Sequence, residues 1–177
     1  QNTFAIYFKH LGMREGLSQV SVMSIYQDEL GRMWFGSMEG LSMYDGENVQ
    51  AFKHFEGATE ELPVGNETFP IVGDQQGNIF VRSDELLIHY DIRKQQFECI
   101  KSGNVTTVYC HNQKVWVGAG DSLYIWNIEE HKFHFIFKTE NASTIQKIFV
   151  DSGNRLWIGT ISGLFRFDNQ YQPVCVI

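Results

Sequence analysis

The chain has 177 residues, of which 43% are hydrophobic and 14% aromatic, a composition typical of a folded protein and not of a disordered one. Its formal net charge is −7, from 14 basic and 21 acidic residues, and no basic cluster is longer than Arg93-Lys94. Nucleic acid is therefore a poor candidate partner, because phosphate neutralisation needs a basic stripe. No apolar run approaches the roughly 20 residues that span a bilayer, so we expect no membrane insertion in this segment.

Three cysteines, Cys99, Cys110 and Cys175, stand in strand-like stretches and form no CxxC pair. An odd count excludes a complete set of intrachain disulfides, and buried free thiols are the simpler interpretation. Cys99 and Cys110 flank one loop and could pair if their strands lie side by side, so the redox state stays open. A chain that starts at Gln1 without Met would suit a product whose leader was removed.

Residues 1–11 alternate apolar and polar side chains and predict a single leading strand, with a loop from there to residue 19. Residues 20–54 then form the first complete unit, in which turn residues separate four short apolar strands. The predicted strands span residues 20–26, 32–37, 41–44 and 49–54. Such a run predicts an antiparallel meander. Residues 55–65, with three acidic side chains, read as an insertion that we expect to be a loop.

The unit recurs at residues 67–100, 105–137 and 144–177. Its second strand carries one aromatic anchor per copy, at Trp34, Phe80, Trp116 and Trp157. Successive anchors are 46, 36 and 41 residues apart, and a period of about 41 is the length of a four-stranded propeller blade. The sequence therefore predicts an all-β fold, with residues 1–177 as a single region of about four propeller blades.

An Asp stands six residues before the anchor in three copies, as Asp28, Asp74 and Asp151. At a tight turn such a carboxylate accepts a backbone N–H two residues on, and we expect the Gly that follows to take the left-handed conformation. The third copy has Cys110 in this place, which predicts a reshaped hairpin.

The anchors alternate with apolar neighbours, so we expect both faces of their strands to be buried between adjacent blades; a sugar-stacking stripe is the alternative. The glycine two residues later, Gly36, Gly118 or Gly159, should let a neighbouring backbone come close. The second copy has Arg82 there, which indicates either a solvent-facing edge or a polar contact at a working surface.

Motifs for catalysis are missing from the sequence: it has no Gly-rich phosphate loop, HExxH, GxSxG or Asp-rich calcium loop. Only two of the six histidines, His131 and His134, are close in sequence, and on a strand they would point to opposite faces. We therefore expect no catalytic residue, no metal site and no cofactor. The candidate ligand-binding residues are polar side chains that break the repeat, with a solvated rim as the alternative. They are Arg82, Asp84, Glu85 and Asp121.

The signature of the first copy is a set of small, apolar and acidic residues at fixed spacing. It comprises Leu17-Ser18, Val22, Ile25, Asp28, Gly31, Trp34, Gly36, Gly40-Leu41 and Tyr44-Asp45. In this pattern, which the fourth copy shares, the chain resembles the two-component regulator propeller repeat, the blade of the periplasmic sensor region of hybrid two-component systems in Bacteroides-type bacteria. The second and third copies keep the frame but lack the Gly-Leu pair.

The resemblance implies that the parent protein holds its propellers outside the inner membrane, binds an oligosaccharide released from a glycan, and signals through a membrane helix to a histidine kinase and a response regulator. Nothing in these residues matches a kinase, a receiver or a DNA-binding segment. We therefore expect an N-terminal, periplasmic and non-enzymatic fragment of such a sensor, with an oligosaccharide as its possible ligand.

In a closed ring of that family the strand at residues 4–8 would complete the last blade, yet four full meanders already follow it here. We therefore expect an open arc, completed either by self-association or by the remaining blades of the parent sensor. Two other functions stay open. One is an enzyme similar to streptogramin lyase, which has a similar propeller and uses a metal with a histidine on the ring surface; the other is a scaffold that binds protein through its edge strands.

Overall fold

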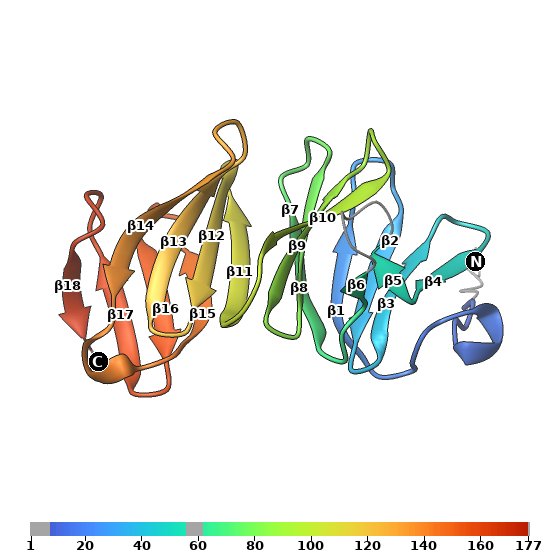
Figure 1. Cartoon of the computed structure of the whole chain (residues 1–177), viewed down its shortest axis with the longest axis horizontal. Helices are drawn as coiled ribbons and strands as arrows, with labels where there is room; N and C mark the ends of the chain where they lie inside the picture. The colour runs from blue at the N-terminus through green and yellow to red at the C-terminus, as the bar shows by residue number, and fades with distance from the viewer. Residues whose placement is uncertain (1–7, 56–61, 177) are drawn as a thin grey trace, which may run out of the picture.

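The computed structural model describes residues 8–55 and 62–176, which form four four-stranded β-sheets standing side by side (Figure 1) and one small two-stranded sheet. Each four-stranded sheet has antiparallel strands in chain order, so each is a meander, and we number these four blades 1 to 4. The predicted all-β fold built from propeller blades is thereby confirmed. Among the described residues the helices are single 3₁₀ turns, η1 (Met13–Glu15) and η2 (Glu140–Ala142), and neither is long and apolar enough to cross a membrane.

The strands of the blades have the following bounds. Blade 1 contains β1 (Val22–Gln27), β2 (Met33–Ser37), β3 (Gly40–Tyr44) and β4 (Val49–Phe52). Blade 2 contains β7 (Thr68–Gly73), β8 (Asn78–Ser83), β9 (Leu86–Asp91) and β10 (Gln96–Lys101). Blade 3 contains β11 (Val105–His111), β12 (Lys114–Ala119), β13 (Ser122–Asn127) and β14 (Lys132–Lys138). Blade 4 contains β15 (Ile145–Val150), β16 (Leu156–Thr160), β17 (Gly163–Phe167) and β18 (Pro173–Val176).

The first strand of each blade packs against the first strand of the next, β1 on β7, β7 on β11 and β11 on β15. One apolar cluster fills each of the three blade boundaries. The anchors Trp34, Phe80 and Trp116 are buried in these clusters, which supports packing and not sugar stacking for them. Trp157 is only partly buried, because no described strand covers its side of blade 4.

The space around the glycine two residues after the anchor differs between blades 1, 3 and 4. A Cβ on Gly36 would lie 1.9 Å from the carbonyl oxygen of Thr68, so the next blade's backbone does come close there. At Gly118 the next blade approaches by a side chain, with Ile145 Cγ2 3.0 Å from where a Cβ would lie. At Gly159 the nearest atom is Lys147 Cβ, 3.6 Å away, and the expected close approach is absent from the described part of the chain.

The Asp turns form as predicted, and each Asp carboxylate accepts two backbone N–H groups where one was expected. Asp28 accepts N–H groups from Leu30 and Arg32, both at 3.0 Å, and Asp74 and Asp151 make the same two kinds of bond. Gly31 (φ 80°) and Gly77 (φ 104°) are left-handed in the first two turns, as expected, and Gln75 (φ 60°) is left-handed as well in the second. In the fourth copy the left-handed residue is Asn154 (φ 58°) and not Gly153, since asparagine also tolerates this conformation.

Two predictions for the N-terminal part of the chain, the leading strand and the insertion loop, differ from the structure. Residues 8–11 lie outside any strand, so that part of the predicted leading strand is wrong, while residues 1–7, including most of the strand at 4–8, lie outside the described residues. The ends of the predicted insertion loop pair as a short hairpin of β5 (His54–Phe55) and β6 (Leu62–Pro63). The loop prediction is wrong there because Phe55 is fully buried, with its ring 5.1 Å from that of Phe97; residues 56–61 are not described.

Cys99 and Cys110 are free thiols on neighbouring blades and do not form a disulfide. Burial raises the pKa of Cys99 above its usual range and raises that of Cys110 to about 12. Both therefore stay protonated and weakly nucleophilic at neutral pH, in keeping with the interpretation as buried free thiols.

Candidate functional site

The turns of the blades gather at two opposite rims. Because the strands of a meander alternate in direction, the turns that join a blade's first strand to its second and its third to its fourth lie at the same end. We call this end the hairpin rim. The turn between second and third strands, and the connection to the next blade, lie at the other end, which we call the crossover rim.

The candidate residues chosen from sequence lie towards the crossover rim. The Arg82 guanidinium donates to the carbonyl oxygens of Val105 and Phe69, both at 3.2 Å, and pairs with Glu67 at 2.9 Å. Asp84 occupies the β8–β9 turn with a left-handed backbone (φ 48°), where its Oδ1 accepts the N–H of Glu67 at 2.9 Å. Arg82 and Asp84 thus hold the chain as it passes between blades.

The other two candidates have similar surroundings. The backbone carbonyl of Glu85 accepts the N–H of Val105 at 3.1 Å, and its carboxylate accepts that of Asn104 at 3.4 Å. Asp121, in the corresponding turn of blade 3, pairs with Lys138 at 3.4 Å. The fold brings Arg82, Asp84 and Glu85 into one hairpin and leaves Asp121 in the next blade. Ligand binding by these four stays a prediction, but each already bonds within the chain.

The first hairpin of blade 3 is the one that departs from the repeat, as the missing Asp predicted. Trp34 pairs with Tyr26, eight residues earlier, whereas Trp116 pairs with Tyr109, seven residues earlier, so the hairpin of blade 3 is one residue shorter. Cys110 consequently lies within β11 opposite Val115 and not in the turn. The turn consists of two left-handed residues, Asn112 and Gln113, at φ 49° and 63°, the conformation of a tight two-residue hairpin.

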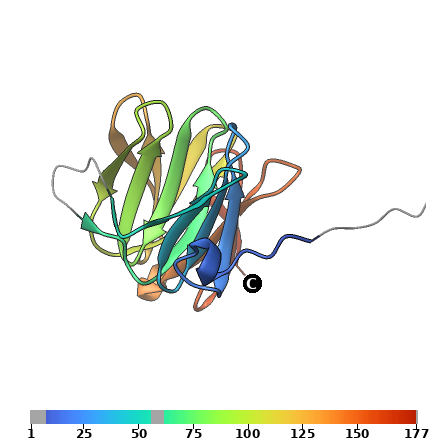
Figure 2. The same cartoon turned by 90° about the vertical axis from the view of Figure 1, so that its right-hand side faces the viewer.

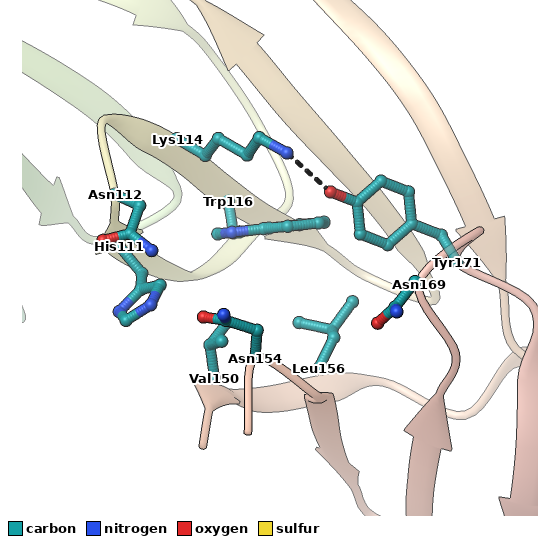
Figure 3. A pocket seen from close by; sticks show the side chains of 9 residues that line it. All are labelled: His111, Asn112, Lys114, Trp116, Val150, Asn154, Leu156, Asn169 and Tyr171. Atoms are coloured by element: carbon teal, nitrogen blue, oxygen red, sulfur yellow. Dashed lines mark hydrogen bonds between the residues drawn. The ribbon is translucent and has the colours of Figure 1, made fainter. Parts of the chain in front are cut away.

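The shortened hairpin leaves the anchor of blade 3 without a cap. The indole N–H groups of Trp34 and Trp157 donate to Asp28 at 2.8 Å and to Asp151 at 2.9 Å. The indole N–H of Trp116 has no acceptor among the described residues, and Figure 3 shows its nitrogen on the side facing His111 and Asn112. The space that the Asp turn fills in blades 1 and 4 is therefore open beside Trp116.

A pocket of about 230 Å³ occupies this space at the hairpin rim, between blades 3 and 4 (Figure 3). Blade 3 supplies one wall from β11, its turn and β12, and blade 4 supplies the other from the ends of β15 and β16 and from its two hairpin turns. The lining residues are His111, Asn112, Lys114, Trp116, Val150, Asn154, Leu156, Asn169 and Tyr171. The sequence reading named none of them as candidates, although Cys110 in the Asp position was a signal that this hairpin differs.

The rings of Trp116 and Tyr171 and the ammonium group of Lys114 lie together on one side of the pocket. Lys114 donates from Nζ to the hydroxyl of Tyr171 at 2.8 Å, and its ammonium lies 5.5 Å from the centre of the same ring. The ring of Tyr171 stands edge-on to that of Trp116, with centroids 5.0 Å apart. Since Trp116 is itself buried, Tyr171 offers the exposed part of the aromatic surface.

The rest of the lining offers hydrogen bonds without acidic groups. Asn112, Asn154 and Asn169 are exposed, and each side-chain amide has two donors and an acceptor. The Nε2 atom of His111 is buried and has no hydrogen-bond partner among the described residues. This combination of neutral amides, one cation and an aromatic ring suits a hydroxyl-rich ligand with apolar C–H faces.

The unusual backbone of Tyr171 belongs to its turn and is no sign of function. Tyr171 has φ 59°, and the corresponding turns of blades 2 and 3 place Gln95 and His131 at φ 55° and 49°. The conformation thus recurs in turns that carry no tyrosine. What distinguishes blade 4 is the tyrosine side chain, which reaches across to Lys114.

A second pocket, of about 480 Å³, follows along the same rim between blades 2 and 3. Its lining includes Asp74, Asn78, Trp126 and His134, and Lys114 lines both pockets. Within the described ranges, no group of three or more His, Cys, Asp and Glu side chains is placed to hold a metal ion.

Comparison with protein families gives a match over part of blade 1. Residues 16–39 match the family described as Two component regulator propeller. Histidine kinase P4 of Formosa agariphila is 38% identical over 47 residues, which are 27% of this chain and 3% of that protein. The chain thus spans a small fraction of the length of this relative.

Solved structures share the architecture over most of the chain. The extracellular domain of a putative hybrid two component system from B. thetaiotaomicron is similar with a TM-score of 0.66 and 24% identity, over 84% of this chain and 20% of that one. Catalytically inactive virginiamycin B lyase from Staphylococcus aureus is similar with a TM-score of 0.67 and 13% identity, over 87% of this chain and 54% of that one. At such identities the likeness establishes the propeller fold alone.

Proposed function

Because this chain carries the two-component regulator propeller repeat, we propose that it is part of the periplasmic sensor region of a hybrid two-component system, where it has no enzymatic role of its own. The match of residues 16–39 to that repeat is the observation that carries the proposal. The likeness of blades 1 to 4 to an extracellular sensor domain supports it at the level of the fold.

The ligand in this proposal is an oligosaccharide derived from a glycan, bound at the hairpin rim. Tyr171 supplies a ring on which a sugar can stack, and the amides of Asn112, Asn154 and Asn169 can bond to its hydroxyl groups. The pocket is smaller than the roughly 300–1,000 Å³ usual for small-molecule sites, so it suits a single sugar ring. The neighbouring pocket along the rim gives room for a second part of a longer chain.

Calorimetric titration of the 177-residue chain with a panel of glycan oligosaccharides and their monosaccharides tests the proposal. We expect heat from an oligosaccharide, and a loss of affinity of at least about tenfold in the Tyr171→Ala variant, since one stacked ring contributes of the order of 1 kcal/mol and its hydrogen bond adds to that. Tyr44→Ala is the matched control, because Tyr44 lies in blade 1, outside the pocket.

The sensor role and the location of the site can be tested separately. If Tyr171→Ala leaves the affinity unchanged, the binding site lies outside this pocket and the proposed sensor role still stands. A panel that gives no heat at all would remove glycan binding from this part of the protein.

A further inference from the structure

The repeat contains its own binding arrangement for a carboxylate. In blade 1 the Oδ2 atom of Asp28 accepts two side-chain donors, the indole Nε1 of Trp34 at 2.8 Å and the Nε atom of Arg32 at 2.7 Å. In blade 4 an anchor and an arginine at the same two positions bond in the same way to Asp151. Figure 2 looks along the row of blades in which this arrangement recurs, with blade 1 nearest the viewer. The anchor and the cation two residues before it thus form a pair of donors for one carboxylate oxygen.

Blade 3 keeps both donors and lacks the acid. Lys114 stands two residues before the anchor Trp116, where blades 1 and 4 have arginine, whereas Cys110 takes the place of the Asp. The Lys114 ammonium bonds instead to the hydroxyl of Tyr171. Trp116 is 2% exposed, and its indole N–H has no acceptor in the described part of the chain (Figure 3). A buried donor without an acceptor is costly, so a group that supplies the acceptor gains this energy on binding.

Blade 2 shows the opposite change. It keeps the carboxylate of Asp74 and has replaced both donors, with Asn78 in place of the cation and Phe80 in place of the indole. The side-chain amide of Asn78 donates to Asp74 Oδ2 at 2.6 Å. Donors that have lost only their carboxylate are therefore a property of blade 3, and the pocket lies where that carboxylate would be.

The remaining lining of this pocket favours an anion as well. None of the residues that line it, as far as the structure describes the chain, is acidic, and Asn112 and Asn154 add amide donors. The carboxylates of Asp74 and Glu129 line the neighbouring pocket between blades 2 and 3. An anion is thus expected beside Trp116 and not in that second pocket.

We propose that the pocket beside Trp116 binds the carboxylate of a uronic acid within an oligosaccharide, with Trp116 and Lys114 as its donors. This inference rests on the proposed glycan binding and adds the charge of the sugar. Lys114 exchanges the neutral hydroxyl of Tyr171 for a carboxylate by rotation about its own side-chain bonds, and so gains the attraction between two opposite charges. The ring of Tyr171 stays available for stacking on the sugar.

Calorimetric titration with matched pairs of oligosaccharides tests the proposal, where one member of each pair carries a hexuronic acid and the other the corresponding neutral hexose. The acid member of at least one pair should bind at least about tenfold more tightly, because a hydrogen bond to a charged group is stronger than one to a neutral group. Lys114→Met should bring the ratio of the two affinities close to one. Trp116→Phe should lower the ratio too, and Phe80 shows that phenylalanine fits the anchor position.

Lys94→Met is the matched control, since Lys94 lies at the hairpin rim in the turn between β9 and β10 and lines neither pocket. It removes the same charge and should leave the ratio unchanged. In the ¹⁵N NMR spectrum the acid member should shift the indole N–H signal of Trp116, identified by its loss in Trp116→Phe. The signals of Trp34 and Trp157 should stay in place, because their acceptors are already bound.

Equal affinities within every pair would overturn this inference and leave neutral glycan binding at the pocket intact. A preference for the acid that survives in Lys114→Met would also overturn it, since the carboxylate would then bind elsewhere. If neither member of any pair gives heat, the proposed glycan binding on which the inference rests is wrong for this part of the protein.

Discussion

The indole Nε1 of Trp34 donates a 2.8 Å hydrogen bond to Oδ2 of Asp28, six residues earlier in the chain, and so joins the turn of blade 1 to the core. The same carboxylate accepts from the Arg32 side chain at 2.7 Å and from two backbone N–H groups. Asp28 is thus a buried acceptor for four donors, where the sequence predicted only a turn.

Replacing Asp28 with alanine should lower the free energy of unfolding by about 3 kcal/mol, since it leaves a partly buried Arg32 and a buried indole N–H unpaired. Urea denaturation followed by fluorescence measures this. Asp45→Ala is the control, because Asp45 accepts only two backbone bonds in an exposed turn and its loss should be far smaller. Equal losses in the two variants would show that the bonds to Trp34 and Arg32 contribute little.

The fourth blade gives a prediction about pH. The indole of Trp157, the backbone N–H of Arg155 and the guanidinium of Arg155 hold the pKa of Asp151 well below its ordinary value of 3.8. A lowered folded-state pKa stabilises the folded chain at pH values above 3.8, and this contribution is lost as the pH falls through the folded pKa. The difference in melting temperature between wild type and Asp151→Asn should therefore be constant near neutral pH and shrink below about pH 4. A difference that is independent of pH would contradict the assignment.

Two glycines at equivalent positions should differ in how much an alanine destabilises the chain. A Cβ at Gly36 would meet the carbonyl oxygen of Thr68, so Gly36→Ala should destabilise the chain by about 3 kcal/mol. Gly159→Ala has room and should change stability by less than about 0.5 kcal/mol. Thermal unfolding of both variants makes the comparison. A large loss for Gly159→Ala would contradict this and would mean that its face is covered in solution.

Alignment of the repeats and the structure give Cys110 two different positions. Alignment on the anchors places it with Asp28, and Cys110→Asp would be expected on that ground to restore the missing cap. In the structure Cys110 pairs with Val115 within the strand and packs against the cluster between blades 2 and 3. The substitution should therefore destabilise the chain by about 2 kcal/mol, from a carboxylate without partners. A more stable variant in urea would show that the hairpin can shift by one residue.

The repeat made most of the fold predictable. A period of about 41 residues with Asp, Gly and an aromatic at fixed spacing specifies a meander, because the turns and the buried strand each need those residue types. The identity of the left-handed residue in the fourth turn was not predictable, since Gly153 and Asn154 can both adopt it. The burial of Phe55 depends on Phe97, more than 40 residues away, which no local pattern records.

The candidate site was not predictable for a related reason. Trp116 and Tyr171 belong to different blades, and their contact depends on how blades 3 and 4 stack. Polar residues that depart from the repeat did not identify the lining of the pocket, because a residue such as Arg82 instead bonds to the backbone of blade 3. The informative change was a deletion: one residue lost from a hairpin removes the Asp acceptor from the indole N–H of Trp116, and its trace in the sequence is only the absence of that Asp.

Lys114 contributes a single ammonium group to two pockets at once. Its bond to Tyr171 draws the charge towards blade 4. Under the proposed glycan binding, a ligand that competes for the tyrosine hydroxyl would release the charge to the space beside blade 2. Occupancy of the two pockets would then be thermodynamically linked, with the factor by which one ligand changes the affinity for the other the same in both directions. Such a rim would respond to the combination of groups that a long ligand presents, and not to each group alone.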